Sequence, residues 1–172
     1  MAEGGKIRLG FRYVKAVGEK AWQKIEEERE QGMYTSLDDF HIRTRLEREA
    51  VENLITVGAF DSLGLPRRQM LWHLRTLMQQ RSDTVPLQLR GSGVQLPDMT
   101  LEDELAGDYQ LQGLSARHHP MEIFRHRVAG DGMLQSSGLN RARTGAKVRV
   151  AGCVICRQAP GTARGHVFIT LE

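Results

Sequence analysis

The 172-residue sequence has little of what secreted and membrane proteins require. Its only cysteines, Cys153 and Cys156, are too few for a disulfide framework, so a reducing cytoplasm is the expected compartment. It contains no apolar run of about 18 residues, which excludes a membrane-spanning helix. Residues 1–6 lack the apolar segment of a signal peptide. Aromatic residues make up only 6% of the chain, so the sequence shows no obvious platform for stacking single-stranded bases.

What is present is an ordinary globular composition with an uneven charge distribution. Apolar residues make up 40% of the chain and charged residues 26%. Residues 1–64 hold ten basic and twelve acidic residues, a net charge of −2. Residues 141–172 hold six basic residues and one acidic residue, a net charge of +5. This basic block indicates an anionic partner such as nucleic acid, and a solvated pair of basic strands is the alternative.

Apolar residues in the first 80 positions recur with the helical period. They predict a helical segment over residues 7–32 with one break at 14–18, then a helical pair capped by Ser36. A further amphipathic helix is expected over 48–57 and another from about 66 to 80. The apolar faces of these helices predict one shared core, which contains Trp22, Ile25, Leu54, Ile55 and Phe60.

The middle of the chain has a different pattern. Residues 81–98 are rich in Ser, Gly and Pro and predict a surface loop or linker. Thr100 is a good N-cap, and Asp103 three residues later completes a capping-box pattern, so a helix is expected to run to about Gln112. A short helix is expected over residues 120–128.

From residue 147 the apolar period becomes two, which predicts strands at 147–156 and 166–171 around a Gly/Pro loop. Residues three apart on a strand face opposite sides, so Cys153 and Cys156 are expected to be buried small apolar side chains rather than zinc ligands. Two strands alone are marginally stable. The tail is therefore expected to be poorly ordered or to pair with the helical body or another copy, as in a fragment of a larger protein.

Three polar clusters in the sequence are candidates for catalytic or metal sites. His118 and His119 lack a partner nucleophile or a third ligand, and a turn that starts a helix at Pro120 explains them. The acidic residues at 38–39 and 102–104 could in principle hold magnesium, but helix starts favour acids in any case. No catalytic residue and no metal ligand is therefore expected.

The break at residues 15–18 is the strongest candidate binding element. A short turn between two helices points the first N–H groups of the second helix outward, where they can bind phosphate without reading a base. Arg12, Lys15 and Lys20 flank the turn and can reinforce those hydrogen bonds. An ordinary helical hairpin, in which Gly18 has only a steric role, is the equally weighted alternative.

Several segments in order along the chain resemble one family. Residues 7–21 (IRLGFRYVKAVGEKA) look like the first helix-hairpin-helix motif of bacterial C-family DNA polymerases. Residues 52–64 (ENLITVGAFDSLG) resemble the close of the second motif, and residues 108–121 the connector that follows. Residues 148–152 (VRVAG) and 155–165 (ICRQAPGTARG) resemble the start of that family's OB-fold, most closely in its error-prone, damage-induced branch.

The resemblance implies a mainly α fold. It comprises a tandem helix-hairpin-helix module over 1–80, the linker over 81–98, a helical connector over 99–146, and the first strands of a truncated OB-fold over 147–172. The implied function is sequence-independent binding of duplex DNA in an error-prone polymerase, during replication, repair and damage tolerance. The expected DNA contacts are Arg12, Lys15, Val17, Gly18, Lys20, Lys147, Arg149, Arg157 and Arg164.

Catalysis by the fragment itself is not expected. The resemblance places the nucleotidyltransferase's paired carboxylates and their Mg²⁺ in a distant palm domain, and this chain has no counterpart and needs no cofactor. Single-stranded DNA at the tail is a further implied partner. Ala16 departs from the family pattern, which more usually has glycine there. The alternative function is a protein-interaction module that docks other components of a translesion complex.

Overall fold

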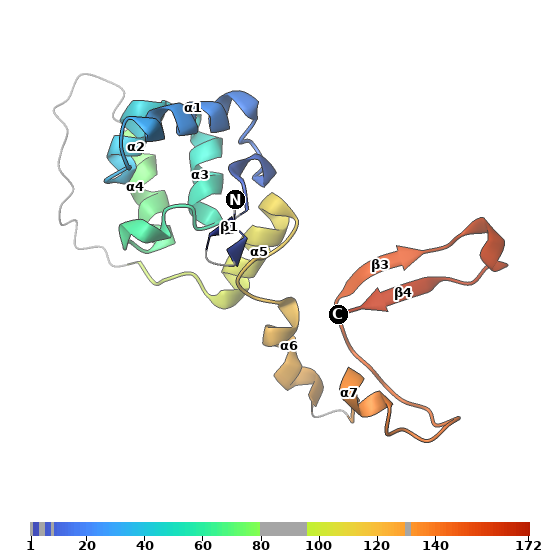
Figure 1. Cartoon of the computed structure of the whole chain (residues 1–172). Helices are drawn as coiled ribbons and strands as arrows, with labels where there is room; N and C mark the ends of the chain where they lie inside the picture. The colour runs from blue at the N-terminus through green and yellow to red at the C-terminus, as the bar shows by residue number, and fades with distance from the viewer. Residues whose placement is uncertain (1, 4–5, 8, 80–95, 130–131) are drawn as a thin grey trace. The chain divides into compact units, whose positions relative to one another are not determined.

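The computed structural model describes residues 2–3, 6–7, 9–79, 96–129 and 132–172 (Figure 1). The chain divides into two compact units, Met1–Ala116 and Arg117–Glu172. Helices dominate, and the second unit ends in a small two-stranded antiparallel sheet. The predicted fold class, mainly α with the first strands of an OB-like sheet at the end, is therefore confirmed.

The extreme N-terminus differs from the expected helix. Strands β1 (Ala2–Glu3) and β2 (Lys6–Ile7) pair antiparallel, so residue 7 begins no helix. The helical part of this region consists of the 3₁₀ turn η1 (Phe11–Tyr13) and α1 (Glu19–Glu30). Gly10 interrupts the pattern between the strand and the turn, and the apolar residues before it do not continue the 3.6-residue period of α1.

Four helices of the first unit surround one core. Helix α2 (Leu37–Thr44) begins where the Ser36 hydroxyl accepts the Asp39 N–H at 3.0 Å, as predicted. Helices α3 (Arg48–Thr56) and α4 (Arg67–Gln79) lie side by side (Figure 1). Between them the chain makes the 3₁₀ turn η2 (Asp61–Leu63). The buried apolar cluster comprises Val14, Val17, Ile25, Leu37, Phe40, Ala50, Val51, Leu54, Ile55, Phe60, Met70 and Leu74.

The predicted core residues share this cluster. Ile25, Leu54, Ile55 and Phe60 are buried, and Trp22 packs against them from a partly exposed position. The rings of Phe40 and Phe60 meet edge to face at 4.8 Å. Each such pair adds about 0.5–1.5 kcal/mol beyond the area it buries.

Helix α5 (Leu101–Gln112) belongs to the first unit and contacts α3. Its N-terminus has the predicted capping box: the Thr100 hydroxyl accepts the Asp103 N–H, and the Asp103 carboxylate accepts the Thr100 N–H. These hydrogen bonds lower the pKa of Asp103. Gly107 allows the approach to α3, because a Cβ there would lie 2.7 Å from the Thr56 methyl group.

The second unit contains α6 (Pro120–Ala129), α7 (Ser136–Leu139) and a hairpin. Strand β3 (Val154–Gln158) pairs antiparallel with β4 (Phe168–Leu171), and the 3₁₀ turn η3 (Gly161–Ala163) lies in the connection. The predicted connector over 99–146 is thus divided, with α5 in one unit and α6 and α7 in the other. Most of the predicted loop at 81–98 lies outside the described residues.

Two expectations for the tail are wrong. The first strand begins at Val154 rather than at residue 147, because the ladder ends where Cys153 and Glu172 exchange backbone hydrogen bonds. Residues 147–152 therefore have no residue of β4 opposite them. Cys153 and Cys156 are half-buried rather than buried, since this two-stranded hairpin is covered by no second layer among the described residues of its unit.

Candidate nucleic-acid interface

The first hairpin turn joins η1 to α1 and is anchored by two valines. Val14 and Val17 are 5% and 3% exposed, and the Val17 N–H donates to the Val14 carbonyl at 3.1 Å. Gly18 is the N-cap of α1, with extended backbone and no side chain to cap the helix. The start of α1 therefore faces solvent. Val17, expected among the DNA contacts, instead has a buried side chain and an N–H already bonded.

Ala16 lies in the left-handed region, with φ of 64°. This conformation costs a residue with a Cβ about 1–2 kcal/mol, whereas glycine adopts it without that penalty. The geometry explains why a glycine is the natural residue at this position of such a turn.

Two hydrogen bonds from outside the turn fix the backbone of Lys15. Its N–H donates to the Leu111 carbonyl of α5 at 2.9 Å, and its carbonyl accepts the Asn53 side-chain amide of α3 at 2.8 Å. Sequence reasoning singled out neither partner. Asn53 lies within the segment that resembles the second motif. That position is the feature of the sequence that could have marked Asn53 as part of the site. The second motif and α5 therefore hold the first turn in place.

The turn leaves donors and cations at one end of α1. No hydrogen bond among the described residues uses the backbone N–H groups of Gly18, Glu19 or Lys20. The side chains of Arg12, Lys15 and Lys20 are exposed around them, with the Arg12 guanidinium 5.8 Å from the Tyr13 ring centroid. Open N–H groups at the positive end of a helix dipole are suited to bind a phosphate.

In the second turn, residues 57–64, the Asp61 carboxylate is paired with a buried arginine. Arg67 is 7% exposed and donates to both carboxylate oxygens of Asp61, at 2.9 and 2.8 Å. It also donates to the Thr56 carbonyl at the end of α3, and the Glu104 carboxylate lies 3.7 Å away. Gly58, with φ of 77°, leaves room for this guanidinium, since a Cβ there would lie 2.2 Å from it.

Burial opposes the charge on Arg67, but the Asp61 and Glu104 carboxylates outweigh that effect and raise its pKa. The guanidinium therefore stays charged and joins α3, η2, α4 and α5. Sequence reasoning missed this residue. Its signal was the spacing to Met70 and Leu74, which places an arginine on the apolar face of α4.

The remaining expected contacts lie in the second unit. Lys147 and Arg149 are in the extended segment before β3, Arg157 is on β3, and Arg164 follows η3 with φ of 48°. All four side chains are exposed. The structure thus gathers Arg12, Lys15, Gly18 and Lys20 at one turn, and distributes the other cations along the hairpin and the extended segment before it.

Comparison with known proteins agrees with this architecture. Residues 1–70 match the family model of the helix-hairpin-helix motif. The chain is 36% identical to error-prone DNA polymerase 1 of Rhizobium meliloti (strain 1021), over 96% of its own length and 16% of that protein. The chain is homologous to part of the error-prone DNA polymerases. This confirms the resemblance to C-family polymerases.

Other error-prone DNA polymerases show the same relationship. Identity is 39% over 87% of the chain for the Bradyrhizobium sp. (strain ORS 278) protein, and 35% over 96% of the chain for that of Caulobacter vibrioides. The chain spans 13% and 16% of those two relatives. None of the helices in the described part of the chain is long and apolar enough to cross a membrane. Among the same residues, no three His, Cys, Asp or Glu side chains gather as a metal site.

Proposed function

We propose that the first unit binds the phosphate backbone of duplex DNA without reading its sequence, as a non-catalytic part of an error-prone DNA polymerase. The observation that carries the proposal is the turn before α1. There the N–H groups of Gly18, Glu19 and Lys20 lie open between three exposed cations. Such groups contact phosphate oxygens, which are the same at every base pair.

The helix-hairpin-helix match over residues 1–70 supports DNA as the ligand. So does the homology to proteins named DNA polymerases. Nucleotidyl transfer and its Mg²⁺ would then belong to a different part of such a polymerase, and this unit would hold the duplex. Damage tolerance would be the process served.

The first experiment is a titration of duplex DNA at two salt concentrations. Each phosphate contact that releases counterions adds about 0.9 to the slope of log affinity against log salt. Lys15→Ala removes one cation but keeps the two backbone hydrogen bonds of that residue. We expect weaker binding to every duplex sequence and a salt slope reduced by roughly one unit. Arg29→Ala, an exposed charge at the other end of α1, is the matched control.

Gly18→Ala tests the backbone contact separately. A Cβ at Gly18 has no neighbour within 4 Å, and its φ of −70° suits alanine, so the variant should fold normally. A phosphate seated on the N–H groups of α1 would meet that methyl group, and affinity should fall. If both Lys15→Ala and Gly18→Ala bind duplex as the unaltered chain does, the hairpin is not the DNA site.

A docking role is the second candidate function, and exposed apolar side chains on the hairpin favour it. Val154, Ile155, Phe168 and Ile169 are each more than half exposed. Such a surface suits a protein partner, for example another component of a translesion complex. Binding that persists at high salt, with no affinity for duplex, would favour this role over the first.

A further inference from the structure

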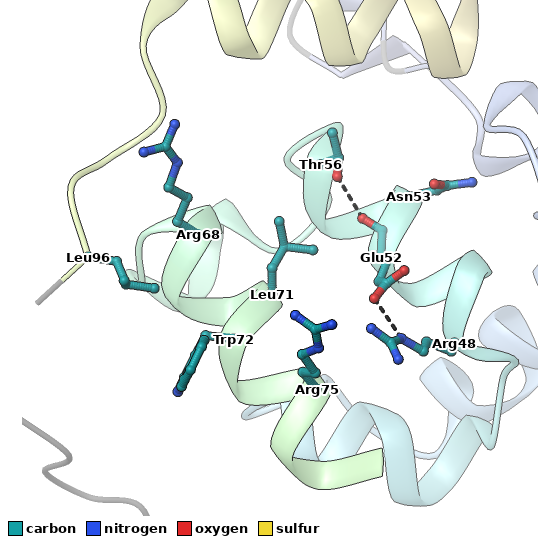
Figure 2. Close-up of a pocket in the computed structure, with 9 residues that line it drawn as sticks. All are labelled: Arg48, Glu52, Asn53, Thr56, Arg68, Leu71, Trp72, Arg75 and Leu96. Carbon is teal, nitrogen blue, oxygen red and sulfur yellow. Dashed lines mark hydrogen bonds and ion pairs between the residues drawn. The ribbon is translucent and has the colours of Figure 1, made fainter. Parts of the chain in front are cut away.

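A groove between α3 and α4 combines cations with an exposed tryptophan (Figure 2). Its volume is about 450 Å³. Arg48 and Glu52 line it from α3, and Arg68, Leu71, Trp72 and Arg75 line it from α4. None of these residues belongs to the hairpin turn assigned above.

The α4 side of the groove has a regular order. Arg68, Trp72 and Arg75 are spaced by four and three residues, so they follow one another along one face of the helix. Trp72 is 50% exposed, so its side chain is accessible to a ligand. Along α4 the tryptophan therefore stands between two arginines, an order that suits a nucleic-acid strand in which bases and phosphates alternate.

The cations of the groove are accessible to an anionic ligand. Arg75 is exposed and forms no ion pair with any residue that the structure describes. Arg48 pairs with Glu52 at 2.7 Å and Arg68 with Asp103 at 2.8 Å, both at the surface. Exposed pairs of this kind contribute at most about 1 kcal/mol, so phosphates can compete with the carboxylates for the guanidinium groups.

We propose that this groove binds single-stranded DNA, with a base stacked on Trp72 and the flanking phosphates held by Arg68 and Arg75. A base that has left its pair can enter a recess between two helices. In a duplex the bases are paired inside the convex backbone, so none of them can enter this recess. Asn53 lines the groove and also bonds the hairpin turn, so the two sites adjoin on α3. The inference extends the proposed function but is tested independently of duplex binding.

Tryptophan emission provides a direct readout. The chain has two tryptophans, and Trp22→Phe leaves Trp72 as the only tryptophan, whose emission can be excited selectively over that of the three tyrosines. In this background we expect a short oligothymidylate to quench the emission of Trp72, because stacking brings the base onto the ring. Poly-glutamate is the comparison anion: quenching by poly-glutamate with none by oligothymidylate would assign the groove to an acidic protein segment and overturn the proposal.

Affinity for the oligothymidylate separates stacking from charge. Trp72→Ala should weaken binding about fivefold to a hundredfold, the range for loss of one stacked base, and Trp72→Phe should restore much of it. Arg75→Ala should lower the salt slope by about 0.7, while the control Arg29→Ala leaves it unchanged. Circular dichroism verifies the helical content of each variant.

The outcomes also separate the two sites. Lys15→Ala should weaken duplex binding and leave oligothymidylate binding unchanged, and Trp72→Ala should do the reverse. If folded Trp72→Ala and Arg75→Ala both bind the oligothymidylate as the unaltered chain does, the groove is not a single-strand site. That result would leave duplex binding at the hairpin intact.

Discussion

The two units of the chain differ in how they use their apolar side chains. In the first, twelve apolar residues form one buried cluster that four helices share. In the second, no described residue is buried, and both strands of the hairpin expose apolar side chains such as Ile155 and Phe168. Apolar sequence periodicity is present in both units, but only the helices of the first have a second layer to bury it.

The two units also differ in the contacts that their polar groups make. In the first unit, Arg67 joins four elements and Asn53 fixes the turn at Lys15. In the second, one ion pair joins His118 and Glu122, one turn apart, and another joins His119 to Glu172 at 3.7 Å. The first unit therefore has the long-range contacts that hold a binding turn rigid. The hairpin of the second unit has only two strands, so a partner layer should be needed to stabilise it.

The largest expected difference is in hydrogen exchange. Amides of residues 50–55 lie in a helix with a buried face and should exchange only through global unfolding. Amides of residues 148–154 lie before and at the start of β3 and should exchange orders of magnitude faster. Equal protection of the two segments, measured on the monomer by mass spectrometry, would show that the hairpin is stable without further layers.

Truncating one phenylalanine side chain in each unit tests the same contrast through the free energy of unfolding. Phe60 is 6% exposed, so Phe60→Ala should cost about 3–5 kcal/mol of unfolding free energy. Phe168 is 58% exposed, so Phe168→Ala should stay within about 0.5 kcal/mol. Urea unfolding followed by helical circular dichroism gives both values. A loss below about 1 kcal/mol for Phe60→Ala would contradict the assigned core.

Breaking an ion pair should also cost more stability in the first unit than in the second, but the difference should be smaller than for the phenylalanines. Asp61→Ala removes the carboxylate that meets the buried Arg67 guanidinium, and should cost about 1.5–3 kcal/mol. Glu122→Ala removes an exposed partner of His118 and should cost about 0.5 kcal/mol or less. Thermal melts of the two variants compare them. Similar losses would mean that Arg67 does not hold the first unit together.

Sequence reasoning succeeded where local signals determine the structure. The Ser36 and Thr100 caps located the starts of two helices, and the period of residues 48–57 located a third to within a residue. Caps and periodicity act within one turn, so the sequence contains them directly. The strand from residue 147 was predicted too long, because a strand extends only as far as its partner. The alternation of apolar residues does not contain that information.

For the candidate site, too, the sequence predicted the local features and missed the contacts between distant segments. The turn at residues 15–18 and its exposed cations could be predicted, since they are close in the sequence. The bonds that fix it come from Asn53 and Leu111, which are distant in the chain. The groove beside Trp72 also depends on how α3 and α4 pack. Contacts between distant segments require the tertiary structure and leave only weak traces in one sequence.

A small change in stability is also expected at the strained turn of the well-packed unit. Ala16→Gly removes the left-handed penalty at φ of 64° but adds freedom to the unfolded chain, so a net gain of about 0.5–1 kcal/mol is expected. The same substitution at Ala106, an exposed position inside α5, should instead cost about 1 kcal/mol. Urea midpoints of the two variants should therefore move in opposite directions. A loss of stability in both would mean that Ala16 is not held in the left-handed conformation in solution.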